Sequence, residues 1–250
     1  MPPKQYRLLD LGPSPAAGPL ADEILLDEAR TGPIACLWRA DQGLVVPRTY
    51  AARPGFNAAQ ADFASQGWPI HVRQSGGGVV PQGPGIINLS LAQPFNGRPL
   101  DHADAFYQHL CGLIAASLLF FGIEARAQAV EGSFCDGRYN LAVGQPARKI
   151  AGTAQWWRRI TPTQDHPAAS QEDHPTQHIG LVHALILVQC DIDQATRQAN
   201  RLEAALDNPR RYRSSSAISL DQCLNPPDRA DFIHQLWLRL ESEILRCPAL

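Results

Sequence analysis

Leu181-Val182-His183-Ala184-Leu185-Ile186-Leu187-Val188 is an apolar stretch in which His183 is the only polar side chain. A strand whose side chains are apolar on both of its faces has to be covered on both sides, so this stretch is predicted to be a buried central strand. Shorter stretches with alternating or short apolar patterns predict further strands around it. These lie at residues 34–38, 44–46, 70–73, 87–91, 127–130 and 139–143.

Helical patterns lie between and after these strands. The longest helix is predicted from Asp101, as its cap, to Phe121, with an apolar face formed by Leu110, Leu113, Ile114 and Leu118. Shorter helices are expected after Asp22, at residues 62–66 and, twice, after the central strand, where Asp228 caps the last one. No internal repeat is visible, so the chain is predicted to form one domain of mixed α/β type.

The composition narrows the class of protein. The chain has 250 residues, of which 44% are hydrophobic and 18% charged, which is typical of a folded domain with a sizeable core. A net charge of -2 gives no reason to expect nucleic acid or an anionic membrane as a partner. The most apolar run, residues 110–121, is too short to span a bilayer. The six cysteines form no CxxC pair, so neither a disulfide framework nor a zinc site is expected. The start of the sequence shows no export signal, which together with the cysteines predicts a cytoplasmic location.

Three segments carry candidate chemistry. The first is Arg73-Gln74-Ser75-Gly76-Gly77-Gly78-Val79-Val80, which lies between two predicted strands. Consecutive glycines expose backbone N–H groups and let a ligand approach the main chain closely. The spacing is not that of a dinucleotide-binding fingerprint. A flexible hairpin without a ligand is the alternative interpretation of this segment.

The second segment is Gly132-Ser133-Phe134-Cys135-Asp136-Gly137-Arg138-Tyr139-Asn140-Leu141, in which Cys135 lies in a polar turn before a strand. We expect Arg138 to favour the thiolate of Cys135, which is the nucleophilic form of the side chain. An inert, half-buried thiol is the alternative. The other five cysteines lie in apolar contexts that indicate structural roles.

The third segment is Arg148-Lys149-Ile150-Ala151-Gly152-Thr153-Ala154-Gln155. A lysine beside small residues has room to place its ammonium against a carbonyl or a phosphate. Lys149 is therefore a candidate for polarising an acyl carbonyl or stabilising the oxyanion that forms when the carbonyl is attacked. The alternative is a surface lysine without a role.

The order and spacing of the three segments resemble the lipoate–protein ligase and octanoyltransferase family, whose catalytic domain is similar to that of biotin–protein ligases. The resemblance covers residues 22–207. It implies a single α/β (α+β) catalytic domain over residues 21–250, after an N-terminal extension over residues 1–20, with a central mixed or mostly antiparallel sheet flanked by helices.

The resemblance also assigns residues. Residues 73–91 look like the R-x-S-G-G-G segment that lines the acyl-chain tunnel in the family, and residues 149–155 look like its K-[IFV]-[SA]-G-[ST]-A-Q signature. This implies that Lys149 contacts the acyl carbonyl and acts in catalysis together with Cys135. The substrate-binding residues that it implies are Arg73, Ser75, Gly76, Gly77, Gly78, Gly85, Gly152, Thr153, Ala154 and Gln155.

The subgroup follows from finer matches. ATP-using ligases usually carry a His-Asp pair after the glycines, where this chain has Gln82-Gly83, and the Arg-Asn-Asp motif of ligases is poorly preserved in Arg138-Tyr139-Asn140. By contrast, residues 132–141 closely resemble the cysteine loop of octanoyl-carrier amidotransferases. The resemblance therefore implies transfer of an octanoyl or lipoyl group onto a lysine of a lipoyl carrier domain, through a thioester on Cys135.

This reading needs no cofactor and implies as partners the glycine-cleavage H protein or the acyltransferase domains of 2-oxoacid dehydrogenases, with the enzyme itself as a monomer. One alternative is an ATP- and magnesium-dependent lipoate–protein ligase, and another is an inactive lipoate- or carrier-binding protein. His71 and His183 are candidate bases for Cys135, although ordinary strand histidines are the preferred interpretation. No metal is expected at His166, His174 and His178, whose segment is better explained as a lid over the site.

Overall fold

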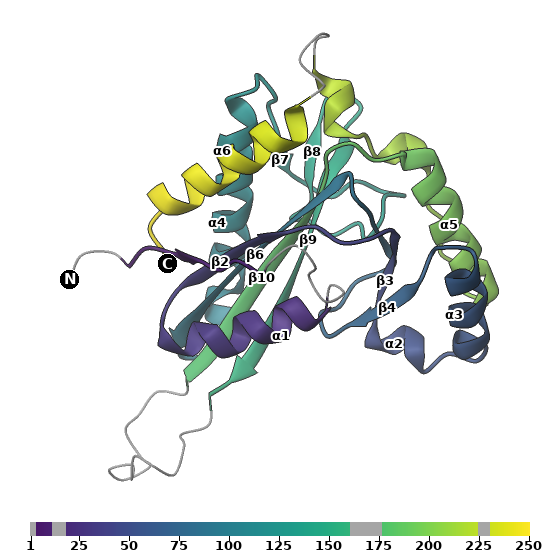
Figure 1. Ribbon diagram of the computed structural model, residues 1–250, viewed down its shortest axis with the longest axis horizontal. Coiled ribbons are helices and arrows are strands. Elements are labelled where there is room, and N and C mark those ends of the chain that lie inside the picture. Colours follow the sequence, from purple (N-terminus) through teal and green to yellow (C-terminus); the bar gives the residue numbers. More distant parts are fainter. Residues whose placement is uncertain (1–3, 12–18, 161–176, 225–230) are drawn as a thin grey trace.

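The computed structural model describes residues 4–11, 19–160, 177–224 and 231–250. Its main feature is a seven-stranded sheet in the order β1-β2-β6-β10-β9-β8-β7 (Figure 1). All neighbouring strands in it are antiparallel except β1 and β2, which are parallel. The strands are β1 (Arg7–Leu8), β2 (Ile34–Trp38), β6 (Ile86–Asn96), β7 (Arg126–Ala127), β8 (Leu141–Val143), β9 (Arg148–Arg159) and β10 (Gln177–Leu187).

The apolar stretch that begins at Leu181 is the middle of the sheet, as the sequence predicts. It belongs to β10, which pairs with β6 on one side and with β9 on the other. The mixed, mostly antiparallel sheet is also confirmed. The predicted strand at residues 127–130 is shorter than expected, because only Arg126 and Ala127 pair with β8 before the chain turns toward Ser133.

Two helices cover one face of this sheet. The side chains of α4 (Pro99–Leu119) and α6 (Phe232–Arg246) pack together with β6 and β10 in the largest apolar core. Phe106 and Phe232 are among its fully buried residues. The long helix is confirmed as α4, but the cap predicted at Asp101 is wrong: Arg98 is the N-cap, Pro99 takes the first helical position, which suits its fixed φ, and Asp101 lies in the first turn. Asp228, the predicted cap of the last helix, lies outside the described residues; α6 begins at Phe232, with Asp231 before it.

The other face is shared by α1 (Pro19–Glu28) and a small sheet. Leu25 and Leu26 of α1 pack on Ile34 and Leu181 in a separate core. The small sheet has the order β4-β3-β5 and comprises β3 (Gly43–Pro47), β4 (Ile70–Arg73) and β5 (Val80–Gln82). A third core joins it to α2 (Arg48–Ala51), α3 (Phe56–Ser65) and α5 (Ile192–Ala205).

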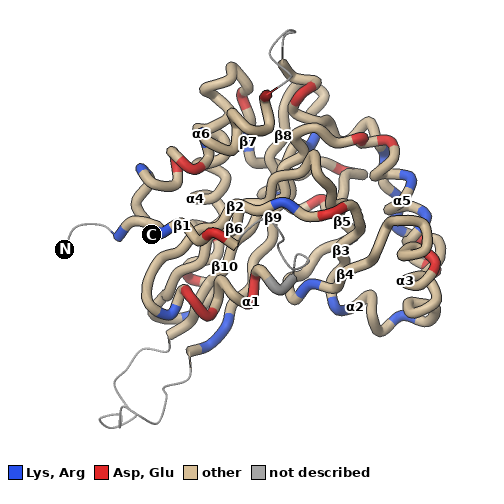
Figure 2. Tube along the Cα trace, in the orientation of Figure 1, with Lys and Arg blue, Asp and Glu red and all other residues tan. Residues whose placement is uncertain are grey.

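Two expectations change in this region. The helix expected at residues 62–66 is longer and begins at Phe56, after Gly55 at a φ of 79°. The glycine-rich segment contains a strand of its own, because Val80 to Gln82 pair with β3. Charged residues lie mostly on the helices and loops around the large sheet rather than in its middle (Figure 2). Among the described residues, no helix is long and apolar enough to cross a membrane.

The first described residues lie against the large sheet. β1 extends the sheet beside β2, and the hydroxyl of Tyr6 donates a hydrogen bond of 2.7 Å to Gln93 Oε1 on β6. The chain end is close by, since Ala249 donates a backbone hydrogen bond to Lys4.

Candidate active site

A cavity lies between the middle of the large sheet and the small sheet. Six of the predicted site residues line it: Arg73, Cys135, Lys149, Gly152, Thr153 and Ala154. The remaining lining residues come from α1, both sheets and the cysteine loop, and are Asp22, Trp38, Val45, Val80, Pro81, Gln82, Asn88, Phe134, His183, Ala184, Leu185 and Leu187. Residues of all three candidate segments therefore line one cavity, although the first segment lies more than 50 residues before the other two.

Cys135 is half-buried and lies in the left-handed backbone region, at a φ of 52°. Its carbonyl accepts hydrogen bonds from Asn140 Nδ2 at 2.8 Å and from the backbone N–H of Gly137 at 2.9 Å. A Cβ atom on Gly77 would lie 2.6 Å from Cys135 Sγ, so only glycine fits at that position. Residues 75–78, called the glycine loop, and residues 132–141, called the cysteine loop, are thus in direct contact.

The cations beside Cys135 differ from the one expected. Arg138 is exposed and pairs with Asp104 instead of the sulfur, because its side chain lies over the ring of Tyr139. Arg73 lies closer, since its Nη2 would be 3.0 Å from a Cβ on Gly77. The pKa of Arg73 is lowered by burial, and the neighbouring Cys135 and Asp22 oppose this shift in part.

Arg73 is buried and organises the glycine loop. Its guanidinium donates hydrogen bonds to the carbonyls of Val45 at 3.1 Å, Gly76 at 2.9 Å and Gly78 at 2.8 Å. Three main-chain carbonyls therefore fix one positively charged group at the base of the loop.

Lys149 is one of the most buried side chains of the described chain, which excludes the surface alternative. Its Nζ donates hydrogen bonds to the carbonyl of Phe134 and, at 3.0 Å, to the carbonyl of Cys135. Burial lowers the pKa of Lys149 to about 8, while Cys135 and Asp136 oppose this shift. A Cβ on Gly152 would lie 2.8 Å from Nζ, so the glycine three residues later makes room for the ammonium.

Two further signature residues make hydrogen bonds that tie strands to their neighbours: Thr153, which lines the cavity, and Gln155, which does not. Thr153 Oγ1 donates to the carbonyl of Tyr139 at 3.0 Å, and Gln155 Nε2 donates to the carbonyl of Ala103 at 2.7 Å. Both bonds tie β9 to its surroundings. Gly85 is a packing position, because a Cβ there would lie 1.9 Å from the carbonyl oxygen of Gln189.

Ser75, Gly76, Gly77 and Gly78 are not among the residues that line the cavity. Ser75 is buried and its Oγ lies 3.3 Å from His183 Nε2, while Gly78 lies against Arg210 and Tyr212. A role of these four residues in substrate binding stays a prediction.

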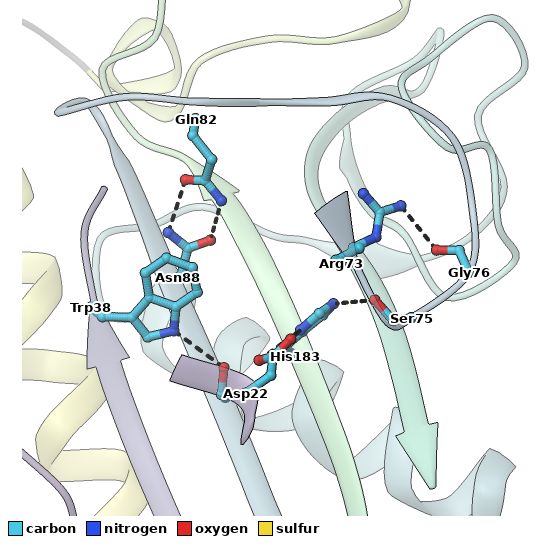
Figure 3. A network of polar contacts seen from close by, with 9 residues as sticks. Asp22, Trp38, Arg73, Ser75, Gly76, Gln82, Asn88 and His183 are labelled. Atoms are coloured by element: carbon cyan, nitrogen blue, oxygen red, sulfur yellow. Dashed lines mark hydrogen bonds and ion pairs between the residues drawn. The ribbon is translucent and has the colours of Figure 1, made fainter. Parts of the chain in front are cut away.

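A polar network in the cavity wall was not predicted (Figure 3). His183 Nδ1 lies 3.2 Å from Asp22 Oδ2, and the amides of Gln82 and Asn88 exchange hydrogen bonds of 2.9 and 3.0 Å. Trp38 lines the same wall and donates to Ser90 Oγ. The available signal was a single polar residue in an otherwise apolar strand, His183, and the polar positions of β6.

Neither His71 nor His183, the two candidate bases, makes a hydrogen bond to the sulfur of Cys135 in the part of the chain that the structure describes. His183 is held by Ser75 and Asp22. His71 is half-buried outside the cavity lining, and burial lowers its pKa. Burial also raises the pKa of the other five cysteines, which agrees with structural roles for Cys36, Cys111, Cys190, Cys223 and Cys247.

The described residues contain no group of three side chains suited to hold a metal ion. His178 is the second residue of β10, and its Nδ1 lies 3.0 Å from the carbonyl oxygen of Gly97. His166 and His174, with most of the segment expected to form a lid, lie outside the described residues.

Comparisons with known proteins give relatives over most of the chain. The family model of the lipoyl protein ligase A/B catalytic domain matches residues 19–241. An uncharacterized protein of Cupriavidus necator is 47% identical over 231 residues, which cover 90% of this chain and 89% of the relative. An octanoyl-[GcvH]:protein N-octanoyltransferase of Kyrpidia tusciae is 32% identical over 212 residues, covering 81% of this chain and 69% of the relative.

Solved structures share the fold at low sequence identity. Lipoate-protein ligase A bound with ATP aligns with a TM-score of 0.64 at 18% identity, over 97% of this chain and 86% of that chain. A bi-partite lipoate protein ligase of Thermoplasma acidophilum aligns with a TM-score of 0.58 at 18% identity, over 97% of this chain and 84% of that chain.

The fold and the matches define an enzyme domain of the class that handles lipoyl and octanoyl groups. The chain belongs to the lipoyl protein ligase A/B catalytic domain family.

Proposed function

We propose that this protein transfers an octanoyl or lipoyl group onto a lysine of a lipoyl carrier domain, through a thioester on Cys135. The proposal rests on one observation: the loop that contains Cys135 contacts both the glycine loop and the buried ammonium of Lys149. Lys149 donates to the carbonyls of Phe134 and Cys135, and Gly77 lies against the sulfur, at the edge of a cavity that extends between the sheets.

The first step forms the acyl-enzyme. The thiolate of Cys135 attacks the carbonyl carbon of the acyl-lysine amide of a donor carrier, and a tetrahedral oxyanion forms. Collapse of this intermediate breaks the C–N bond, and the departing lysine amine takes up a proton. Lys149 is mostly protonated at neutral pH, because its pKa is about 8, and it stabilises the oxyanion.

The second step delivers the acyl group. The ε-amine of an acceptor lysine attacks the thioester, the C–S bond breaks, and the amine loses a proton as the new amide forms. One amide is exchanged for another, so the reaction needs no nucleotide. Each buried methylene of the acyl chain contributes about 0.8 kcal/mol, so eight carbons supply on the order of 6 kcal/mol before the costs of binding.

The amide pair of Gln82 and Asn88 supports transfer over ATP-dependent ligation. Gln82 stands where ATP-using relatives of the family carry a His-Asp pair, and here both of its polar atoms bond to Asn88. The names of relatives specify octanoyl-[GcvH] as donor, which makes an octanoylated GcvH-type protein the first donor to test. Monomeric state and cytoplasmic location remain predictions from the sequence.

The test is to incubate the protein with an octanoylated carrier in the absence of ATP and to measure the intact mass. We expect an octanoyl adduct on Cys135, followed by transfer to an unmodified carrier. Cys135→Ser should give no adduct and no transfer while remaining folded, because the substitution is nearly isosteric. Full transfer by Cys135→Ser, or pyrophosphate release with ATP and lipoate, would reject the thioester route in favour of the ligase.

A further inference from the structure

A segment far along the chain supports the cysteine loop from outside the cavity. Residues 210–218, called the support segment, donate three hydrogen bonds to the start of that loop. Arg213 N bonds the carbonyl of Gly132 at 2.8 Å, and Arg213 Nη2 and Ser216 Oγ bond the carbonyl of Glu131 at 3.0 and 2.8 Å. The N–H of Ile218 donates to the carbonyl of Lys149 at 2.9 Å. The segment therefore holds the main chain of Lys149 and of Glu131 and Gly132, which precede Cys135 by four and three residues.

Tyr212 is the residue of the support segment that meets both loops of the site. Its ring packs on the ring of Phe134 with centroids 5.5 Å apart, and Phe134 is the residue whose carbonyl accepts from Lys149. Its hydroxyl would lie 3.0 Å from a Cβ on Gly78, so the glycine loop rests against it. Tyr212 does not line the cavity, so it has no direct route to the reacting atoms.

A buried carboxylate on α5 fixes the position of Tyr212. Glu203 is fully buried, and its Oε1 accepts hydrogen bonds from Tyr212 at 2.6 Å and from Tyr50 at 2.7 Å. Burial and the bond to Glu203 raise the pKa of Tyr212 well above its usual value, so its hydroxyl stays a donor. Asn200 adds two bonds to the main chain of Tyr212, at 2.9 and 2.8 Å.

These contacts bear on the backbone conformation of Cys135. A non-glycine residue in the left-handed region persists only where its surroundings hold it, and Cys135 is such a residue. Among the described residues, α5 contributes no side chain to the cavity, yet it anchors Tyr212 by a carboxylate and by two main-chain bonds.

We propose that Glu203 and Tyr212 are positioning residues that hold Cys135 in register with Lys149 and the glycine loop. The proposal rests on the function proposed above for Cys135 and Lys149. It assigns α5 and the support segment to the geometry of acyl transfer, through the Phe134 ring and the Gly78 backbone.

The test uses Tyr212→Phe, which keeps the ring on Phe134 and removes only the hydroxyl. We expect the rate constant for acylation of Cys135 to fall by about tenfold to hundredfold, because small misplacements of reacting groups have effects of this size. The KM for the acyl donor should stay within about twofold, since the cavity lining is unchanged. Glu203→Gln keeps an oxygen acceptor for the Tyr212 hydroxyl and should retain more activity than Glu203→Leu.

A matched control separates positioning from stability. Tyr6 is also a buried tyrosine, and its hydroxyl donates to a side-chain oxygen, Gln93 Oε1, at 2.7 Å on the far strands of the large sheet. Tyr6→Phe should lower Tm by a similar amount and leave the acylation rate unchanged. Wild-type acylation by Tyr212→Phe at a temperature where it is folded would overturn the proposal.

A second readout does not depend on acyl chemistry. The rate of Cys135 alkylation by iodoacetamide at pH 7.5, followed by peptide mass, should fall severalfold in Tyr212→Phe and not in Tyr6→Phe, because the rate depends on how the cysteine loop presents the sulfur to the reagent. If wild-type protein forms no acyl-enzyme, the transfer proposal fails while this measurement still decides the positioning proposal. Equal alkylation rates in both variants would overturn it.

Discussion

The two faces of the seven-stranded sheet are both buried, yet they are built from different chemistry. The face under α4 and α6 is apolar and is filled by side chains such as Phe106 and Leu236. The side toward the small sheet holds an ammonium, an imidazole with its carboxylate, and a pair of amides around one cavity. Buried polar groups cost free energy unless they are paired, so a wall that retains them indicates a site rather than a core.

The first prediction tests whether the apolar face supplies stability alone. Phe106→Ala removes a fully buried ring that contacts Phe95 and Trp157, and it should lower the free energy of unfolding by about 3–5 kcal/mol in urea titrations. Acylation of Cys135 per folded molecule should be unchanged. A stable Phe106→Ala variant without activity would show that the two faces are coupled.

Lys149→Met addresses the polar side. The substitution keeps the apolar stem but removes the charge, so acylation of Cys135 should slow by roughly a hundredfold to a thousandfold, as when one oxyanion donor is deleted. Binding of the acyl chain should change far less, because the cavity walls supply most of its energy. Arg148→Met is the matched control, since it removes an exposed charge one residue earlier and should have little effect. A Lys149→Met variant that acylates normally would make Lys149 structural.

The third prediction concerns the pH dependence of stability. Lys149 has a pKa lowered from 10.5 to about 8 by burial, so above pH 8 the unfolded chain binds more protons than the folded one. Stability therefore rises with pH in this window, and the penalty of the buried charge is fully present below pH 8. Relative to Lys149→Met, the unfolding free energy of the wild type should gain about 3 kcal/mol between pH 8 and pH 10.5. A difference that is flat over this window would contradict the shift.

The comparison of the two faces also shows which parts of the fold and of the site could be predicted from the sequence. The central strand, the mixed sheet and the meeting of Cys135 with Lys149 follow from local patterns and from the resemblance to a family. The partner of Arg138 was mispredicted, because Asp104 lies on α4, 34 residues away in the chain. Tyr212 and Glu203 carried no local signal, since only the folded chain places them beneath the cysteine loop.

The smallest effect expected is at the backbone of Cys135. A residue with a Cβ atom at a φ of 52° is strained by roughly 1–2 kcal/mol, whereas glycine adopts this region freely. Glycine also loses about 0.5–1 kcal/mol more on folding, because its unfolded chain is more mobile. Both Cys135→Gly and Cys135→Ala should be inactive, and the glycine variant should be the more stable one by about 0.5–1 kcal/mol.

Asp207 supplies the control for this last difference, because it also has a positive φ, 49°, but lies at the exposed end of α5 outside the cavity lining. Asp207→Gly should likewise be more stable than Asp207→Ala in urea titrations, without any loss of acylation. The same sign at both positions would show that backbone strain is common to both, and that only at Cys135 does it coincide with the reaction. If Cys135→Gly is instead less stable than Cys135→Ala, the cysteine loop relaxes around Cβ, and the polar side of the sheet holds its geometry without strain.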